Sequence, residues 1–415
     1  MTTAPARGRR RADTAVPHGG PSRLLALAST GTALAALALC LAPGAMGTAS
    51  AGAAASGASG ARAHAPCPPA LTLPQQPTTR LSWQRNLWAR TWQFSPTGRK
   101  RDEIRIAAAY AGKGTANLGT QVVPPTLLDT AVVAGGKNVV VATNGDYFVD
   151  VPGGGVPYSA VIENSRVVYS PRGLSRVAAI DAEGALRTAH VELSASARSG
   201  KVTYPIAAVN DPRVLREDIV LFTERWGLTR IPRRTHAVVV QDGRVLRVAG
   251  PSARVSVPPG GAVLASKSAT PFQGLATGAR VRLSVGVVAR DGLGVVTASG
   301  HGSSLLRDGK IKPLCSDYEN TLRPRTVLAW DDKGGVWLLT SGPMRPDPES
   351  GDRMGGTTKT QLAQVAQTLG ATEAVTLDGG GSTSMFVHRG KAVTRLDLPE
   401  NRLLRLVPVA WTLTR

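Results

Sequence analysis

The stretch TKTQLAQVAQTLGATEAVTLDGGGSTS, from Thr358 to Ser384, decides the fold. Its first half predicts an amphipathic helix over Thr358 to Leu369, because apolar residues recur there at i, i+3, i+4 and i+7. Thr357 or Thr358 supplies the N-cap and Gly370 ends the helix. The apolar run Ala374 to Leu377 then predicts a buried strand. Asp378 therefore lies at a strand end, where a carboxylate projects from rigid backbone.

Three glycines follow this carboxylate. Gly379, Gly380 and Gly381 let the main chain approach a ligand closely, because they carry no Cβ atom. Their N–H groups, together with the hydroxyls of Ser382 and Thr383, have the composition of an anion-binding nest that can cradle phosphate. The alternative interpretation is an ordinary Gly-rich turn.

Upstream of this stretch the sequence alternates short β-type runs with Gly, Pro and Asp turns, which predicts a strand-rich domain. The clearest predicted strands are Ile104 to Tyr110, Val139 to Ala142, Ala237 to Gln241, Val281 to Val288, Val327 to Trp330 and Val336 to Leu339. Turns are predicted at Asp242-Gly243, Asp308-Gly309 and Lys333-Gly334. A second helix is predicted from Thr126 to Ala134, with an apolar stripe of Leu127, Leu128, Ala131 and Val132.

A second strand end repeats the arrangement around Asp378. The run Val139 to Thr143 leads into Asn144-Gly145-Asp146-Tyr147-Phe148, which places an amide, a carboxylate and two aromatic rings at one terminus. Asn-Gly is also the commonest hairpin turn, so a plain type I′ turn is the alternative. Against that alternative, an aromatic pair in a chain with only 4% aromatic residues suits the apolar wall beside a sugar.

Three weaker groups of residues complete the candidates. His301 lies between two glycines in Ser299-Gly300-His301-Gly302, where a solvated histidine is the default expectation. Arg325 and Thr326 enter a strand, and an arginine there can grip a phosphate through two parallel hydrogen bonds. The segment Ser341-Gly342-Pro343-Met344-Arg345 is expected to be a turn.

Composition limits the class of protein. The chain has 415 residues, 42% of them hydrophobic, so it can build a core and is neither disordered throughout, nor collagen-like, nor a disulfide-stapled miniprotein. The formal net charge of +21 is typical of a nucleic-acid binder. The arginines are spread along the chain, however, so the charge alone predicts no dedicated polyanion surface and we expect no nucleic-acid partner.

The N-terminus predicts export. Five arginines precede an apolar run from Leu24 to Leu41, and Ala49-Ser50-Ala51 has the small residues of a signal-peptidase site. We therefore expect a signal peptide over residues 1–51, secretion, and no stable membrane insertion after cleavage; an uncleaved anchor is the alternative. Residues 52–79 are rich in Ala, Gly, Ser and Pro and predict a disordered tether. Cys67 and Cys315 would remain after cleavage, either as a disulfide or as two thiols.

The order and spacing of these segments resemble the phosphodiester glycosidase family. The similarity covers about residues 80–415 and rests on Thr126 to Phe148, on SGHGSSLLRDGK from Ser299 to Lys310, on Pro324-Arg325-Thr326 and on Thr358 to Ser384. It implies one catalytic α+β domain over 80–415, built around a twisted mixed sheet with a few helices. It also implies hydrolysis of the bond between a sugar anomeric carbon and a phosphodiester.

The resemblance carries the family's functional positions onto this chain. The expected catalytic residues are Asp378, Asp146 and Arg325. The expected substrate-binding residues are Asn144, Gly145, His301, Thr326, Gly379, Gly380, Gly381, Ser382 and Thr383. Our hypothesis is that one of the two aspartates attacks the anomeric carbon or activates water, while Arg325 and the hydroxyls hold the phosphate and Asn144 orients the sugar. The partner would be a glycosyl phosphodiester or another anionic glycan.

Three alternatives remain open. Two Asp-bearing strand ends with an Asn also suit Ca²⁺ or Mg²⁺. Where relatives have Asp-Gly-Arg after the penultimate strand, this chain has Thr340-Ser341-Gly342-Pro343, with only Arg345 or Asp347 nearby as replacements. That departure is compatible with a non-catalytic module that binds anionic wall polymers. A secreted nuclease is the third alternative, although no His-rich or Lys-rich nuclease pattern is present.

Overall fold

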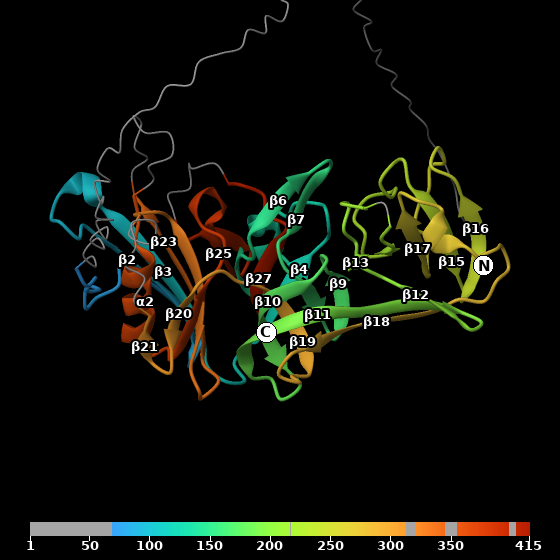
Figure 1. The fold of residues 1–415 in the computed structure, drawn as a ribbon. Helices are drawn as coiled ribbons and strands as arrows, with labels where there is room; N and C mark the ends of the chain where they lie inside the picture. The colour runs from blue at the N-terminus through green and yellow to red at the C-terminus, as the bar shows by residue number, and fades with distance from the viewer. Residues whose placement is uncertain (1–68, 216, 313–320, 345–354, 398–403) are drawn as a thin grey trace, which may run out of the picture. The chain divides into compact units, whose positions relative to one another are not determined.

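The computed structural model describes residues 69–215, 217–312, 321–344, 355–397 and 404–415. These residues all lie in the unit formed by residues 62–415. They contain many strands and few helices, as the turn-punctuated sequence predicts (Figure 1). No helix among them is both long and apolar enough to cross a bilayer. The predicted signal peptide and both mature cysteines lie outside the described residues.

An eight-stranded sheet carries one half of the candidate site. Its order is β1-β2-β3-β23-β22-β24-β20-β21. The strands are β1 (Thr79–Gln84), β2 (Leu87–Phe94), β3 (Ile104–Ala111), β20 (Ser304–Arg307), β21 (Lys310–Ile311), β22 (Arg325–Trp330), β23 (Val336–Pro343) and β24 (Glu373–Thr376). Every neighbouring pair in this sheet is antiparallel, so the expected mixed sheet is wrong for it. Short turns join several neighbours, and such turns can connect only antiparallel strands.

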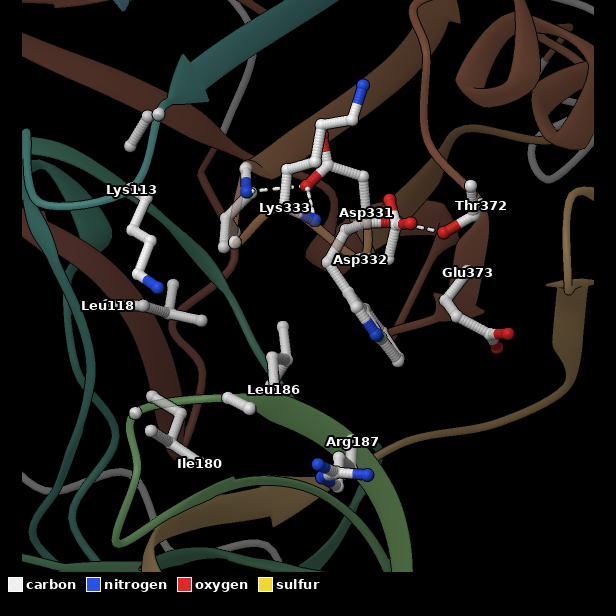
Figure 2. Close-up of a pocket in the computed structure, with 18 of the residues that line it drawn as sticks. Lys113, Leu118, Ile180, Leu186, Arg187, Asp331, Asp332, Lys333, Thr372 and Glu373 are labelled. Carbon is white, nitrogen blue, oxygen red and sulfur yellow. Dashed lines mark hydrogen bonds between the residues drawn. The ribbon is translucent and has the colours of Figure 1, made fainter.

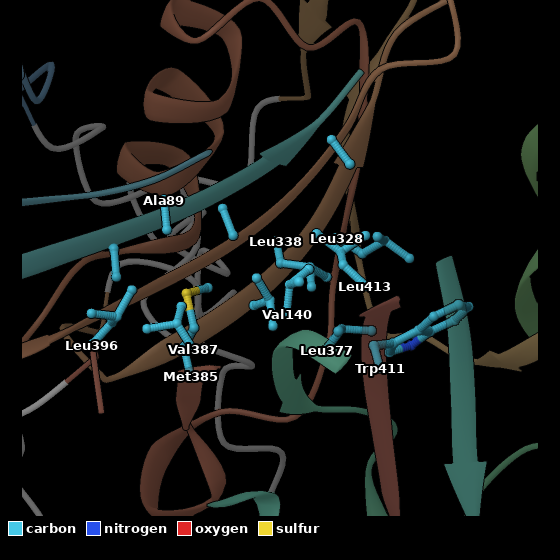
Figure 3. Close-up of a cluster of buried hydrophobic side chains, with 14 of the residues drawn as sticks. Ala89, Val140, Leu328, Leu338, Leu377, Met385, Val387, Leu396, Trp411 and Leu413 are labelled. Carbon is cyan, nitrogen blue, oxygen red and sulfur yellow. The ribbon is translucent and has the colours of Figure 1, made fainter. Parts of the chain in front are cut away.

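A five-stranded sheet, β26-β25-β5-β27-β4, carries the other half. Its strands are β4 (Asn117–Val122), β5 (Val139–Asn144), β25 (Met385–Arg389), β26 (Ala392–Arg395) and β27 (Val409–Thr414). Leu328 and Leu338 of the eight-stranded sheet pack with Val140 and Leu413 of this sheet in one buried cluster (Figure 3). A face-to-face pair of sheets therefore forms the core beside the site.

The other face of the eight-stranded sheet packs against helix α2 (Lys359–Thr368). Strand β3 shows the period-two alternation that allows this: Ala107 and Ala109 face the five-stranded sheet, whereas Ile106 and Ala108 join the cluster beneath the helix. The helix, the eight-stranded sheet and the five-stranded sheet therefore make three successive layers.

Three further sheets complete the described part of the chain. A seven-stranded sheet contains β8 (Val161–Glu163), β9 (Arg166–Tyr169), β10 (Leu174–Asp181), β11 (Leu186–Ser199), β12 (Val202–Pro205), β18 (Arg282–Ala289) and β19 (Val295–Gly300). A second five-stranded sheet contains β13 (Ala208–Val209), β14 (Val220–Thr223), β15 (His236–Gln241), β16 (Arg244–Ala249) and β17 (Gly261–Ser266). Strands β6 (Phe148–Val151) and β7 (Gly154–Pro157) form a separate hairpin. Three short 3-10 turns are η1 (Lys100–Asp102), η2 (Thr270–Phe272) and η3 (Gly380–Ser382).

The six predicted strands are all present, with edges that differ by a few residues. The predicted turns are present too, and Asp242, Gly243, Asp308 and Gly309 have the positive φ of tight hairpins. The turn expected at Ser341 to Pro343 is wrong, because these residues continue β23. Ser341 pairs with both Arg325 and Ile106, so main-chain pairing on both sides keeps the segment extended.

The helix predictions had different outcomes. Helix α2 matches its prediction: Thr358 is the N-cap, forms a capping box with Gln361, and Gly370 follows with φ +101°. The helix expected over Thr126 to Ala134 is only α1 (Thr130–Ala134), capped by Asp129. Residues before it are extended, because Leu128 pairs with Val407. The expected apolar stripe is also wrong, since Val132 is 73% exposed.

The ordered domain begins earlier than residue 80. Leu71, inside the predicted tether, is buried in the cluster beneath α2, and its N–H donates to Gln364 Oε1 at 3.0 Å. The Pro-rich composition of residues 69–79 gives no sign of this contact, in which Leu71 and Leu73 pack on the cluster beneath the helix. The tether prediction is therefore wrong for at least this part of residues 52–79.

Candidate active site

Asn144 ties the ends of three strands together. Its Nδ2 donates to the carbonyl oxygen of Asp378 at 2.7 Å. Its Oδ1 accepts from the Thr326 hydroxyl at 2.7 Å and from the Ser384 N–H at 3.1 Å. In return, the Asp378 N–H donates to the carbonyl of Gly145 at 2.9 Å. The ends of β5, β22 and β24, which come from two sheets, therefore meet at one fully buried amide.

The Asn144-Gly145 pair is not the type I′ turn that its sequence also allows. Neither residue has a positive φ. Gly145 instead lies against β27: its N–H donates to the Val409 carbonyl at 2.8 Å, and a Cβ on Gly145 would lie 2.8 Å from Val409 Cγ1. The glycine is needed here for close packing of the backbone.

Asp146 is a buried carboxyl behind this junction. It is 2% exposed, and its Oδ2 accepts from the Ser159 N–H at 2.9 Å. Gly300, at the end of β19, provides the space, because a Cβ there would lie 2.1 Å from the same oxygen. Burial raises the pKa of Asp146 to about 7; N–H groups of Ser159 and Tyr147 oppose the rise, and the negative charge of Asp378 adds to it. The two predicted carboxylates are therefore electrostatically coupled.

Asp378 is the more accessible of the two. It is half-buried, and its Oδ1 accepts from the Gly379 N–H at 2.9 Å. Burial raises its pKa, whereas the Ser382 hydroxyl, the Gly379 N–H and the positive charge of Arg405 lower it. The groups that stabilise its anion make Asp378 the carboxylate better suited to carry negative charge in contact with a ligand.

The glycine loop is less open to an anion than its sequence suggests. The N–H groups of Gly380, Ser382 and Thr383 donate to the carbonyls of Pro324, Gly379 and Gly380, respectively. Together with the Gly379 N–H on Asp378, two donors of the expected nest, the N–H groups of Gly379 and Gly380, thus have partners within the protein. An anion bound beside this loop would rely mainly on side chains.

His301 is buried, so the expected solvated histidine is wrong. Its Nδ1 lies 2.9 Å from the Gly302 carbonyl, and a carbonyl can only accept, so Nδ1 carries the proton. Burial lowers the pKa of His301 to about 4, helped by the positive charges of Arg176 and His190. At neutral pH the ring is uncharged, and its Nε2 has no partner among the described residues.

The predicted phosphate ligand Arg325 is also buried. Its Nε donates to the Thr357 carbonyl at 2.9 Å and its second guanidinium nitrogen donates to the Thr321 carbonyl at 2.8 Å. Thr326 is fully buried and points at Asn144. Both residues therefore brace the segment that leads into α2 and the Asn144 junction. Their predicted roles toward a substrate remain predictions.

Two cations beside the site were not predicted from the sequence. The guanidinium carbon of Arg405 lies 4.6 Å from the centre of the Phe148 ring, and its charge acts on Asp378. Lys359 is buried at the first turn of α2, with its Nζ 2.9 Å from the Ser303 hydroxyl. A lysine at a helix N-terminus opposes the helix dipole and is a usable signal. Arg405 gives no such signal, because it is an ordinary arginine before the last strand.

A wide cavity lies elsewhere on these strands. Its volume is about 1170 Å³, and it lies beside Trp330 and Glu373. Figure 2 shows charged side chains such as Lys113, Lys333 and Arg187 around it. Because β22 runs from Arg325 to Trp330, and β24 from Glu373 to Thr376, the cavity and the candidate site lie at opposite ends of the same strands. None of the predicted site residues lines it. Within the described ranges no three His, Cys, Asp or Glu side chains form a metal-binding group.

Residues 234–414 match the phosphodiester glycosidase family. The match confirms the predicted resemblance and includes His301, Arg325 and Asp378, whereas Asn144 and Asp146 precede it. The search of curated protein sequences gave no match.

Solved structures share the fold. A hypothetical protein from Synechocystis has a TM-score of 0.61 at 20% identity, over 82% of this chain and 64% of its own, so this chain spans under two thirds of that protein. A Burkholderia pseudomallei protein named as exported has a TM-score of 0.59 at 16% identity, over 75% and 74% of the two chains. The catalytic domain of zebrafish N-acetylglucosamine-1-phosphodiester alpha-N-acetylglucosaminidase, auto-inhibited by its pro-peptide, has a TM-score of 0.42 at 14% identity, over 82% and 87%. The first two likenesses concern the fold alone, and the third carries no argument about this chain.

Proposed function

We propose that this protein is a secreted hydrolase that cleaves the bond between a sugar anomeric carbon and a phosphodiester on a cell-surface or extracellular glycan. The family match over residues 234–414 supports the reaction class. The observation that carries the proposal is the hydrogen bond from Asn144 to the Asp378 carbonyl. This contact brings a segment outside the matched region, with its own carboxyl at Asp146, to the Gly-rich strand end that belongs to the match.

The two carboxyls take different roles in this proposal. Asp378 is half-buried, more accessible than Asp146, and has three groups that stabilise its anion. It therefore supplies the negative charge facing the anomeric carbon, where an oxocarbenium-like transition state develops. Asp146 is too buried to touch a substrate. It acts through Asp378: with a pKa of about 7 it holds a proton at neutral pH in part of the molecules, which limits like-charge repulsion within the pair.

The leaving phosphate needs charge neutralisation more than a proton, because the phosphomonoester anion released from the anomeric carbon is already a good leaving group. Arg405 suits this task. Its side chain is 51% exposed and lies 4.0 Å from Asp150, its guanidinium lies over the Phe148 ring, and its charge acts on Asp378. A Cβ on Gly381 would lie 3.9 Å from Arg405 Cδ, so the glycine loop and this arginine border the same space. Phe148 beneath the guanidinium supplies the apolar surface expected beside a sugar.

Secretion is part of the same proposal. It rests on the arginines, the apolar run and the small-residue site within residues 1–51. An extracellular enzyme would meet sugar phosphodiesters as wall or capsule polymers. The strongly basic composition is compatible with such anionic partners.

The test is to incubate the protein with a series of sugar-1-phosphodiesters and to follow free sugar and phosphomonoester by mass spectrometry. Release of both products in equal amounts is expected. Asp378→Asn should abolish turnover, and Asp146→Asn should alter its pH profile. Wild-type turnover in both variants would refute the assignment. Binding of a wall polymer without any released sugar would instead favour the non-catalytic binding module.

A second experiment, with a chelator, tests whether the site needs Ca²⁺ or Mg²⁺. Asp146, Asp378 and Asn144 provide oxygen atoms of the type that Ca²⁺ or Mg²⁺ prefers. Turnover that is lost on chelation and restored by either ion would add a cation to the proposed site. Turnover that persists in the presence of the chelator would mean that the side chains described above carry out the reaction.

A further inference from the structure

A second, basic pocket lies beside β15 and the loop before it. Its volume is about 420 Å³, and it lies between residues 227–233 and 253–255. Arg230, Arg233 and Arg254 line it, and none of its lining residues is acidic. In the part of the chain that the structure describes, none of these three guanidinium groups is paired with a carboxylate. The pocket therefore gathers three uncompensated positive charges.

The backbone that carries these arginines is anchored. The indole N–H of the buried Trp226 donates to the Arg230 carbonyl at 3.0 Å. The N–H of the buried Ile231 donates to the Val255 carbonyl at 3.0 Å, which joins the two segments that form the pocket. Trp226, Ile231 and Val255 belong to one hydrophobic cluster. The two backbone segments that carry the three exposed arginines are thus held together by a folded frame.

Charge and shape together define the ligand chemistry. Like charges held together repel, and a phosphate that binds among them removes that repulsion. The guanidinium group also matches phosphate oxygens through paired hydrogen bonds. Leu228 and Val255 add apolar surface, which suits the carbon skeleton of a sugar or polyol between phosphates. The pocket thus favours an anionic polymer over a neutral glycan.

The β6–β7 hairpin links this pocket to the candidate active site. A Cβ on Gly153, at the hairpin turn, would lie 3.2 Å from Leu228 Cδ1 at the pocket. At the other end of β6, the Phe148 ring lies beneath Arg405. Five residues of extended chain span roughly 16 Å, at about 3.3 Å per residue. A polymer with recurring phosphates could therefore contact both places along the hairpin.

We infer that this pocket, defined by Arg230, Arg233 and Arg254, binds a further phosphate of a polymeric phosphodiester substrate whose cleaved bond lies at Asp378. The inference rests on the proposed function for the identity of the cleaved bond. It adds that the natural substrate is a repeating phosphodiester polymer and that the arginine pocket sets the affinity for it.

The test compares two triple variants that remove equal charge. The pocket variant is Arg230→Ser, Arg233→Ser and Arg254→Ser; the control variant is Arg85→Ser, Arg99→Ser and Arg389→Ser, at exposed positions outside the pocket. Binding of a defined poly(glycerol phosphate) is measured by calorimetry in the full-length secreted protein. Circular dichroism melts check that both variants are folded. Affinity should fall at least tenfold in the pocket variant and less than twofold in the control.

Small substrates separate this inference from the proposed function. The pocket variant should retain wild-type kcat/KM on a sugar-1-phosphodiester that has a single phosphate, because that substrate cannot reach the pocket. Equal loss of polymer affinity in both triple variants would overturn the inference and assign the binding to net charge. Inorganic phosphate that binds the pocket as tightly as the polymer would also overturn it. If the wild type hydrolyses no small substrate, the proposed function fails, while the calorimetry still decides what the pocket binds.

Discussion

Replacing Asn144 with alanine tests the junction on which the candidate site depends. The substitution removes three hydrogen bonds: one to the Asp378 carbonyl, one from the Thr326 hydroxyl and one from the Ser384 N–H. Water cannot reach these groups readily, because Asn144 is fully buried. The Thr326 hydroxyl can rotate toward another acceptor, whereas the two main-chain groups cannot.

The size of the effect follows from these counts. A buried polar group left without a partner costs about 1–3 kcal/mol, so two such groups cost about 2–6 kcal/mol of unfolding free energy. Domains of this kind have about 5–15 kcal/mol in total, so the variant should remain folded at room temperature. Turnover should fall by at least about tenfold, because a displacement of about 1 Å in a reacting group can cost a hundredfold.

Asn210 provides a matched control. It is also fully buried, and its side chain makes three hydrogen bonds, to the Val168 carbonyl, the Thr223 hydroxyl and the Thr223 N–H. Asn210→Ala should destabilise the fold at least as much, since φ is +52° there and alanine adds about 1 kcal/mol of strain. Urea unfolding gives both stability changes, and release of free sugar gives both rates. If Asn144→Ala costs under about 1 kcal/mol and keeps wild-type turnover, the junction does not hold the site.

Three further predictions concern the charged groups. Gly300→Ala should lower the unfolding free energy measured in urea by about 1–3 kcal/mol, because its Cβ would overlap the Asp146 carboxylate. The control Gly294→Ala has open space around its Cβ and should change the unfolding free energy little. The pKa of Asp146 in the folded state lies above its unfolded value, so the folded state binds the extra proton and this group stabilises the fold less as pH rises from about 4 to about 7. Asp146→Asn should therefore gain stability relative to wild type as pH rises across that window. A difference in unfolding free energy between variant and wild type that stays constant with pH would contradict the burial argument. Arg405→Ala should raise KM for a small sugar-1-phosphodiester about tenfold or more if the arginine holds the phosphate. The control Arg389→Ala should leave KM unchanged. Equal KM values in the two variants would exclude Arg405 from the site.

The sequence alone was enough to locate the elements that carry the site. Helix α2 could be predicted with its cap and its stop, because Thr358, the apolar spacing and Gly370 are local signals. The strand ends at Asn144 and Asp378 could also be predicted from the sequence, since an apolar run followed by polar residues and glycines marks where a strand leaves the core. These are short-range effects, and they depend little on the rest of the fold.

Local signals failed where a distant partner decides the conformation. Residues before α1 are extended because Leu128 pairs with Val407, and Ser341 stays in β23 because strands on both sides bind it. Burial of Leu71 against α2 depends in the same way on a contact almost 300 residues away. In each case the deciding hydrogen bond lies far away along the chain.

The chemistry of the site depends on the same kind of contact. Asp146 is an ordinary carboxylic acid in the sequence, and only the packing of Gly300 against it and the exclusion of water raise its pKa to about 7. Arg405 becomes relevant only because β27 carries it to Phe148 and Asp378. The residue types and the strand ends are fixed by the order of amino acids. Their protonation and their neighbours are set by tertiary structure, because desolvation and Coulomb interactions depend on distance in space rather than on separation along the chain.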